Sequence, residues 1–319
     1  MQMIKHDKRC VHLSMYTNTE FNMEKDFKKQ GAKSFFSDLK SLVKGIVLIA
    51  NVLPILSGFW LALYFTDSSF IMFWDKFLYM LVGGTLLMAG ALMLNNWYEV
   101  DLDENMMRTQ ERPTVTGNFS LNTVLTAGIV SSILGMILLF MTTIEAAVYG
   151  FIGWFTYVVL YTFWSKRKYT LNTVIGSVSG AVTPLIGWAV ITSAYHIVPI
   201  LLSLMLFIWQ IPHTFAIAMR RHDEYKAANV PMLPVVYGFD MTKRQIAVYV
   251  LCLLPLPFFL TSLGAFFVSV MTVLNIAWIA IAVKGVFSKE NKQYANTMFY
   301  FSLTYMTVAF GLMILMTLI

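Results

Sequence analysis

A polar and acidic stretch follows the second long apolar segment of this sequence. If one helix continues through it, Asn95, Glu99 and Asp103 lie four residues apart on a single helix face, within an arc of about 80°. Asp101 and Glu104 then point away from that face and are interpreted as solvated side chains. Amide and carboxylate oxygens on one rigid surface suit Mg²⁺, which proteins bind through one or two carboxylates together with substrate phosphates. The spacing therefore predicts a magnesium site.

Cationic residues near this acidic stretch are candidates for binding a phosphate-bearing substrate. Two acids four residues apart repel each other by roughly 0.2–0.5 kcal/mol unless a counter-ion is near, and arginine can hold a phosphate through two parallel hydrogen bonds. The candidates are Arg108 and Arg112 after the acidic stretch, and Lys166 and Arg167 shortly after Tyr161. The competing interpretation is a solvated acidic helix end with ordinary loop cations. The loops alone leave both interpretations open.

A second group of polar residues lies in and after the sixth apolar segment. His213 follows Pro212 inside that segment, and an ionisable side chain within a membrane span is a functional candidate by default, as an iron ligand, a proton carrier or a propionate partner. A histidine hydrogen-bonded to a neighbouring helix is the competing interpretation. Beyond the segment, Asp223 could supply a second carboxylate site. Met219, four residues earlier, offers no oxygen, so a second metal site would have fewer ligands than the first.

The composition shows what kind of framework must position these groups. Of the 319 residues, 58% are hydrophobic and 13% are charged, and the mean hydropathy is +0.66. Soluble domains carry about 45–50% apolar and about 25% charged residues, so an ordinary soluble enzyme is excluded and the lipid bilayer is the expected surrounding. The two cysteines, Cys10 and Cys252, form neither a disulfide framework nor a zinc-ligand pattern.

Nine apolar segments are long enough to cross a bilayer, which requires about 20 residues each. The predicted fold is therefore an all-α polytopic membrane protein with about nine transmembrane helices. The nine predicted segments are Leu42–Phe65, Phe77–Tyr98, Asn122–Thr143, Ala146–Trp164, Leu171–Thr192, Val198–Met219, Gln245–Leu263, Ala265–Val283 and Thr297–Leu318.

The charged residues indicate the orientation of these segments. With nine crossings, every Lys and Arg except Lys76 lies on one side of the membrane, and all acids except Asp67, Asp75 and Glu145 share that side. Because cytoplasmic loops are enriched in Lys and Arg, the N-terminus is predicted to be cytoplasmic and the C-terminus outside. The net charge of +6 is then largely a property of membrane topology. We expect no nucleic-acid partner, and chemistry on the cytoplasmic face.

Two regions are predicted along the chain: a polar cytoplasmic tail over residues 1–41 and a membrane domain over residues 42–319. The tail lacks the apolar core of a signal peptide, and its acids are unlike a mitochondrial transit peptide. A bacterial plasma membrane is the predicted location.

Three long stretches of this sequence resemble the UbiA superfamily of intramembrane prenyltransferases. They are NNWYEVDLDENMMRTQERP (95–113), YTFWSKRKYTLNTVIGSVSGAVTPLIGW (161–188) and WQIPHTFAIAMRRHDEYKAANVPMLPVV (209–236). The superfamily's first motif, NxxxDxxxD, matches Asn95, Glu99 and Asp103 with Glu in the middle position. Its second motif, DxxxD, matches only at Asp223, and the Pro212-His213 pair is similar to the branch that farnesylates heme. The resemblance runs from about Leu42 to the C-terminus.

This resemblance implies a transferase that moves the farnesyl group of farnesyl diphosphate to a vinyl group of heme B, giving heme O and diphosphate. It implies Mg²⁺ as the cofactor and the downstream heme A synthase as a candidate partner. The implied metal ligands are Asn95, Glu99, Asp103 and Asp223. The implied diphosphate-binding residues are Arg108, Arg112, Lys166 and Arg167. The resemblance further implies that Tyr161 orients the diphosphate and that His213 holds the heme.

Two alternative functions remain at this point. The same fold can carry a quinone or chlorophyll precursor as acceptor, which a panel of acceptors would distinguish. A proton-coupled transporter using Glu99, Asp103 and His213 as a relay is an alternative of a different class, supported only by acids and a histidine near the membrane.

Overall fold

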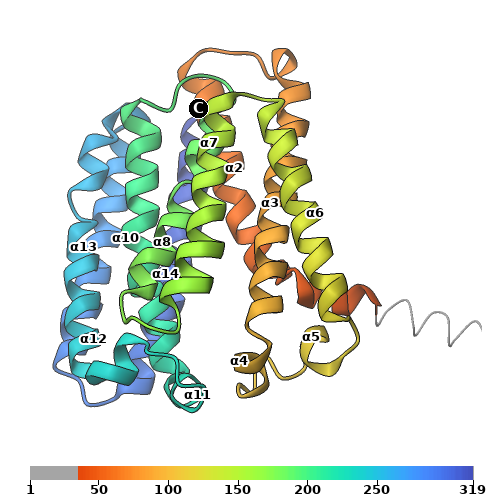
Figure 1. The fold of residues 1–319 in the computed structure, drawn as a ribbon. Helices are drawn as coiled ribbons and strands as arrows, with labels where there is room; N and C mark the ends of the chain where they lie inside the picture. The colour runs from red at the N-terminus through yellow and green to blue at the C-terminus, as the bar shows by residue number, and fades with distance from the viewer. Residues whose placement is uncertain (1–34, 319) are drawn as a thin grey trace, which may run out of the picture.

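The computed structural model describes residues 35–318, and every regular element in that range is a helix (Figure 1). The predicted all-α class is confirmed for this part of the chain. The α-helices are α2 (Gly45–Phe65), α3 (Trp74–Tyr98), α4 (Val100–Glu104), α5 (Pro113–Thr116), α6 (Leu121–Phe140), α7 (Ile144–Phe155), α8 (Asn172–Ala181), α9 (Thr183–Ala189), α10 (Ile197–Arg220), α11 (His222–Ala227), α12 (Leu233–Cys252), α13 (Ala265–Val286) and α14 (Asn291–Met316). The 3₁₀ turns are η1 (Phe70–Met72), η3 (Leu256–Phe259) and η4 (Thr261–Leu263), and η2 (Thr156–Ser165) is a π-helix.

Seven helices of the described chain are long and apolar enough to cross a membrane, which confirms a polytopic membrane protein. They coincide with seven of the nine predicted segments, and one of them combines α7 with η2. The seven helices are Gly45–Phe65, Trp74–Tyr98, Leu121–Phe140, Ile144–Ser165, Ile197–Arg220, Ala265–Val286 and Asn291–Met316.

The other two predicted segments, 171–192 and 245–263, differ from single long helices. The first is divided into α8 and α9, because Pro184 has no amide proton for the helical hydrogen bond and the Thr183 hydroxyl donates to the Gly180 carbonyl instead, at 2.6 Å. The second begins before residue 245, since α12 starts at Leu233 and is broken at Gly238, whose φ of 78° is not helical; after α12 come the turns η3, which contains Pro257, and η4. The count of nine crossings stays a prediction.

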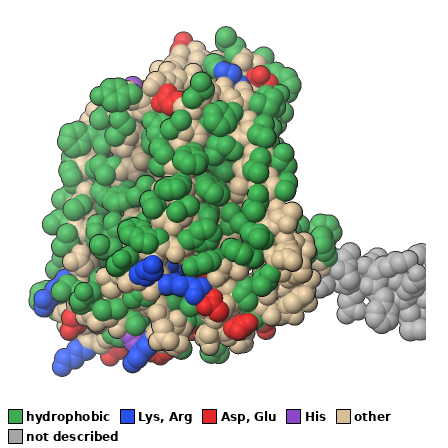
Figure 2. All heavy atoms as spheres, in the orientation of Figure 1, with side chains coloured by type: hydrophobic (Ala, Val, Ile, Leu, Met, Phe, Trp, Pro, Cys, Tyr) green, Lys and Arg blue, Asp and Glu red, His purple; other side chains and the backbone are tan. Residues whose placement is uncertain are grey.

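The two ends of the helical bundle differ in their short elements and in their charge. The short helices α4, α5 and α11 lie together at one end, and the C-terminus lies at the opposite end (Figure 1). Apolar side chains cover the middle of the visible surface, whereas most of its charged side chains gather at the end that carries α4 and α11 (Figure 2). A bundle with an apolar waist and one strongly charged end fits the predicted arrangement of loops. Its orientation in the membrane stays a prediction.

The last residues of the predicted tail pack against the membrane domain. Residues 35–42 are helical, the Phe35 ring lies 5.8 Å from the Phe119 ring, and the Asn118 amide donates to Asp38 Oδ2 at 3.0 Å. The Asn96 amide in α3 donates to the Leu42 carbonyl at 2.6 Å. The chain is therefore fixed to α3 before α2 begins. Residues 1–34, which make up most of the predicted tail, lie outside the described residues.

Helices α2 and α9 are in backbone contact because glycines line their interface. A Cβ atom on Gly187 would lie 1.9 Å from the Ile55 carbonyl oxygen, and one on Gly58 would lie 2.1 Å from the Pro184 carbonyl oxygen. Small residues that allow helix backbones to approach closely are a main source of packing in membranes. This contact fixes α2, whose N-terminal end carries part of the site described below.

Replacing Gly187 with Ala should therefore separate α2 from α9 and lower stability. Overpacking of this kind costs about 1–3 kcal/mol, and the obstructing atoms are backbone, which cannot rotate away. Gly311→Ala is the matched control, because a Cβ atom on Gly311 meets nothing within 4 Å, and alanine favours a helix over glycine by roughly 0.5–1 kcal/mol. Unfolding measurements in detergent should show a lower free energy of unfolding for Gly187→Ala and no decrease for Gly311→Ala. Equal effects of the two substitutions would contradict the packing argument.

Candidate functional site

Asn95, Glu99 and Asp103 share one buried face, although the helix that carries them is interrupted. Helix α3 ends at Tyr98, and Glu99 joins it to α4. The Glu99 amide still donates to the Asn95 carbonyl at 3.0 Å, and the Asp103 amide donates to the Glu99 carbonyl at 2.8 Å. These bonds preserve the four-residue spacing through the junction. The three residues are only 1%, 2% and 3% exposed, in chain order.

Each of these three residues is paired with a different cation. The Lys166 Nζ donates to Glu99 Oε1 at 2.6 Å and to Oε2 at 2.5 Å. The Arg112 guanidinium donates to Asp103 Oδ2, and the Lys44 ammonium donates to Asn95 Oδ1. The structure thus brings together the predicted metal ligands of the first motif and two of the four predicted diphosphate-binding residues.

The electrostatics of this cluster keep the Glu99–Lys166 pair ionised. Burial alone would raise the pKa of Glu99, but Lys166, Lys44 and Arg112 together hold it below its ordinary value. Burial alone would lower the pKa of Lys166, whereas the Glu99 carboxylate raises it above its ordinary value. The Lys166 side chain is 14% exposed and that of Glu99 is 3% exposed. A carboxylate and an ammonium that stay charged at neutral pH can bind a metal cation and a phosphate, respectively.

The π-helix η2 positions Tyr161 and Thr162 at the site, and Lys166 directly follows it. In η2 the hydrogen bonds span five residues, and the Lys166 amide bonds the Tyr161 carbonyl at 2.9 Å. The Tyr161 ring lies under the Lys166 ammonium, 5.5 Å from Nζ, and its edge contacts Gly176, where a Cβ atom would be 2.9 Å from the ring. The Thr162 hydroxyl accepts a hydrogen bond from the Asn95 amide at 3.0 Å. Functional sites are a frequent location of π-helical segments.

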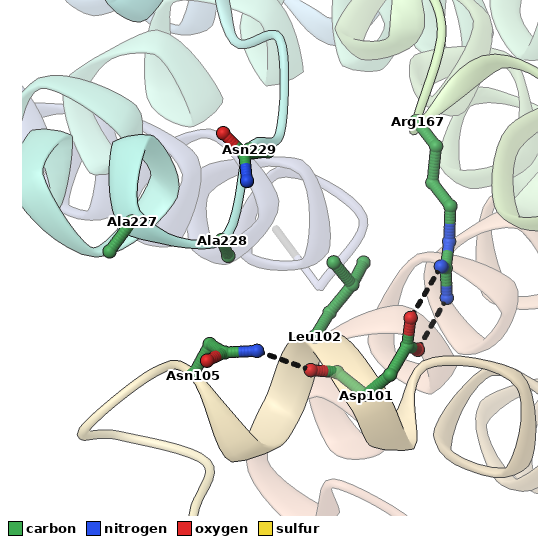
Figure 3. Close-up of a pocket in the computed structure, with 7 residues that line it drawn as sticks. All are labelled: Asp101, Leu102, Asn105, Arg167, Ala227, Ala228 and Asn229. Atoms are coloured by element: carbon green, nitrogen blue, oxygen red, sulfur yellow. Dashed lines mark hydrogen bonds and ion pairs between the residues drawn. The ribbon is translucent and has the colours of Figure 1, made fainter.

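Arg167 contacts the opposite, exposed side of α4. Its guanidinium makes two 2.7 Å hydrogen bonds to Asp101 (Figure 3), which lower the pKa of that carboxyl. The guanidinium also lies 4.8 Å from the centre of the Tyr98 ring. The Asp101 side chain is 64% exposed. A shallow polar hollow separates this pair from the loop after α11. Its lining residues are Asp101, Leu102, Asn105, Arg167, Ala227, Ala228 and Asn229.

The residues predicted around the sixth segment, His213 and Asp223, form no hydrogen bond or ion pair with the buried cluster. Asp223, at the start of α11, has a fully exposed side chain that accepts a 2.9 Å hydrogen bond from His222. Arg108 is also exposed. Among residues 35–318, no three His, Cys, Asp or Glu side chains converge as a metal-ligand group. A metal in the buried cluster would therefore depend on the amide of Asn95 in addition to the two carboxylates.

His213 faces helix α14. Its Nδ1 is 2.7 Å from the Ser302 hydroxyl, and its ring is stacked between Trp209, at 4.7 Å, and Phe299, at 5.3 Å. The competing interpretation, a histidine hydrogen-bonded to a neighbouring helix, describes this contact. Nε2 is the ring nitrogen that remains for a ligand.

Two residues of the cluster were not among the predicted site residues. Lys44 is one of many lysines predicted on the cytoplasmic side, and the sequence offers no signal that distinguishes it from its neighbours. Thr162 lies four residues before Lys166, and that spacing was the available signal.

The family model described as the UbiA prenyltransferase family matches residues 51–304. The chain belongs to this family. Its relatives include the protoheme IX farnesyltransferase of Oceanobacillus iheyensis, 53% identical over 291 residues that cover 91% of this chain and 93% of the relative. Protoheme IX farnesyltransferase 2 of Bacillus subtilis is 50% identical over 283 residues, covering 89% and 93%. Family membership confirms the predicted resemblance.

Solved structures of distant relatives share the family's fold. A digeranylgeranylglyceryl phosphate synthase superposes with a TM-score of 0.71 at 18% identity, covering 88% of this chain and 98% of the other. A UbiA homologue from Archaeoglobus fulgidus bound to GPP and Mg²⁺ superposes with a TM-score of 0.60 at 14% identity, covering 86% of this chain and 99% of the other. At this level of identity the likeness concerns the fold.

The buried Glu99–Lys166 pair and the exposed Asp101–Arg167 pair allow a matched test of how burial strengthens an ion pair. Glu99→Gln should destabilise the protein by about 3 kcal/mol or more, because it leaves several largely buried cations with one carboxylate. Lys166→Met should cost less, since Lys44 and Arg112 remain near Glu99. A double-mutant cycle, in which the free energy of unfolding in detergent is measured for both single variants and the double variant, gives the coupling energy between Glu99 and Lys166.

The control is the same cycle for Asp101 and Arg167, an exposed pair expected to couple by less than about 1 kcal/mol. Equal coupling energies in the two cycles would show that burial does not strengthen the Glu99–Lys166 pair.

Proposed function

We propose that this protein transfers the farnesyl group of farnesyl diphosphate to a vinyl group of heme B, giving heme O and diphosphate. The observation that carries the proposal is that relatives named protoheme IX farnesyltransferase match about nine tenths of the chain at about half identity. The buried cluster supports it, because carboxylates paired with cations provide both halves of a site for a metal–diphosphate complex.

Asn95, Glu99 and Asp103 would hold Mg²⁺. Asp223, the fourth predicted ligand, has an exposed side chain bonded to His222 and would join them only after a movement of α11. The donor set fits this ion, since it consists of oxygens from one amide and carboxylates on one buried face. Bound there, Mg²⁺ supplies positive charge that stabilises the departing diphosphate. The Archaeoglobus homologue bound to GPP and Mg²⁺ supports this assignment.

The cations of the cluster would bind the diphosphate and stabilise its departure. Cleavage of the carbon–oxygen bond leaves the electron pair on the diphosphate, and Lys166 and Arg112 are positioned to donate hydrogen bonds to that growing negative charge. Arg108 and Arg167 would contribute from the exposed side. Tyr161, held beneath Lys166, would orient the diphosphate.

The apolar end of the site would receive the allylic cation and the acceptor. The rings of Tyr157 and Tyr161 lie 5.6 Å apart, and aromatic faces attract positive charge. A vinyl group of the heme would attack the cation, which moves the positive charge to the carbon next to the heme ring; water would add to that carbon and lose a proton to give the hydroxyethylfarnesyl substituent. His213 would contact the heme through Nε2, because Nδ1 is bonded to Ser302.

The proposed location is a bacterial plasma membrane with the site facing the cytoplasm. Relatives from Bacillus and Oceanobacillus support a bacterial membrane, and the charged end that carries α4 and α11 supports the orientation by the positive-inside rule. The downstream heme A synthase is the proposed recipient of the product.

The direct test supplies purified protein in detergent with heme B, farnesyl diphosphate and Mg²⁺. We expect a heme enlarged by one C15 group, and a loss of about 100-fold or more in turnover for Glu99→Gln and Asp103→Asn, which remove charge from the diphosphate site. Asp101→Asn should keep most activity, because Asp101 lies on the exposed side of α4. If Asp223 is a ligand, Asp223→Asn should raise the Mg²⁺ concentration needed for half-maximal rate.

Several outcomes would contradict the proposal. Folded wild-type protein that forms no farnesylated heme would exclude it, and product from a quinone or chlorophyll precursor instead of heme would identify a different acceptor. Proton-coupled flux in liposomes without diphosphate release would indicate a transporter.

The assignment of His213 to the acceptor predicts a selective kinetic effect. His213→Phe should raise the KM for heme severalfold and leave the KM for farnesyl diphosphate unchanged, because His213 lies between aromatic rings and bonds Ser302 and no residue of the buried cluster. Ser302→Ala, which removes only the Nδ1 partner, is the matched control with a smaller expected effect. A change in the KM for farnesyl diphosphate alone would refute the assignment.

A further inference from the structure

Lys44 occupies a constrained turn at the start of α2. Its backbone has φ 48° and ψ 55° in the left-handed region, which non-glycine residues seldom adopt outside functional or structural constraints. Hydrogen bonds hold this turn from both sides: the Lys44 amide donates to the Ser41 carbonyl at 3.1 Å, and the Val47 amide donates to the Lys44 carbonyl at 2.7 Å. The turn directs the Lys44 side chain onto Asn95 in α3.

The partners of the three cations are not equivalent. Lys166 and Arg112 face carboxylates, whereas Lys44 faces a neutral amide oxygen. The cluster therefore holds three cations and two buried carboxylates, which leaves one positive charge in excess. Lys44 is partly buried, and a partly buried cation without a counter-ion is costly unless an anion binds beside it.

The pairing also places one cation on each predicted metal ligand of the first motif. Lys44, Lys166 and Arg112 occupy Asn95, Glu99 and Asp103 one to one. An incoming metal ion and anion would therefore exchange partners with all three pairs, because the metal takes the oxygens while the anion takes the cations. Lys44 loses the weakest interaction in this exchange, since its present hydrogen bond is to an uncharged amide oxygen.

We propose that Lys44 is a further cation of the diphosphate site, beside Lys166 and Arg112 in the buried cluster, and that its ammonium moves from Asn95 Oδ1 to a phosphate oxygen of the prenyl diphosphate. The move frees the Asn95 oxygen for the metal. This inference rests on the proposed function, because it takes the prenyl diphosphate as the ligand of the buried cluster. Lys44 acts by binding the substrate.

The test is calorimetric titration of the full-length protein in detergent with inorganic diphosphate and Mg²⁺. Lys44→Met should weaken diphosphate binding about tenfold to a hundredfold, as expected for loss of a hydrogen bond between charged groups. Lys44→Arg should retain affinity within a few-fold. Lys40→Met, in the same segment but with an exposed side chain, is the matched control and should bind like wild type.

A purely structural role predicts a different pattern. If Lys44 only stabilises the turn, Lys44→Met lowers the unfolding temperature without ligand and leaves diphosphate affinity unchanged. The proposed role expects an unliganded unfolding temperature no lower than that of wild type, and a smaller stabilisation by Mg²⁺ and diphosphate. If Lys44→Met does not fold, Lys44→Gln keeps a donor for Asn95 Oδ1 without the charge and takes its place.

The remaining outcomes separate this inference from the proposed function. Unchanged diphosphate affinity in Lys44→Met, in an enzyme that farnesylates heme, overturns the role of Lys44 alone. Tight diphosphate binding that depends on Lys44, in a protein that does not farnesylate heme, overturns only the proposed acceptor. An effect on binding of phosphatidylglycerol vesicles but not of diphosphate would assign Lys44 to a lipid headgroup and overturn the inference.

Discussion

Glu99 and Asp103 place two carboxylates at the end of an apolar bundle, where each is at most 3% exposed. An uncompensated charge in such surroundings costs several kcal/mol, so each carboxylate requires a cation within hydrogen-bonding distance. This requirement organises the charged end of the molecule. The turn before α2, the loop after α4 and the π-helix η2 are far apart in sequence, and each brings one cation to the same face of α3 and α4.

The elements around the cluster keep these cations in place. The Thr109 hydroxyl bonds the Asp103 carbonyl at 2.9 Å and folds the loop that carries Arg112 back onto α4. The Asn96 amide holds the Leu42 carbonyl at 2.6 Å, which fixes the approach to Lys44. The glycine contacts between α2 and α9 then anchor α2 itself. The apolar packing of the bundle and the polar contacts of its charged end thus form one connected framework.

Much of the site could be predicted from the sequence, because helical spacing places Asn95, Glu99 and Asp103 on one face whatever surrounds them. Seven of the predicted segments correspond to long helices, since apolar length alone defines such spans. The contact of Lys44 with Asn95 could not be predicted, because the sequence does not distinguish a lysine that only lies in a cytoplasmic loop from one that binds a substrate. The break at Val182 depends on Pro184 and a local hydrogen bond. Helix α12 begins in a stretch that contains Asp240, Lys243 and Arg244, so hydropathy marks neither feature. The exposed position of Asp223 depends on tertiary packing.

The π-helix has a consequence for the direction in which Lys166 points. Each residue of an α-helix advances about 100° around the axis, and a π-helical turn accommodates one more residue than an α-helical turn. If the same ten residues, Thr156 to Ser165, formed an ordinary α-helix instead, they would complete more turns, and Lys166 would be rotated away from Glu99. The π-helical geometry of this segment, and not only its residue types, therefore determines that Lys166 reaches Glu99.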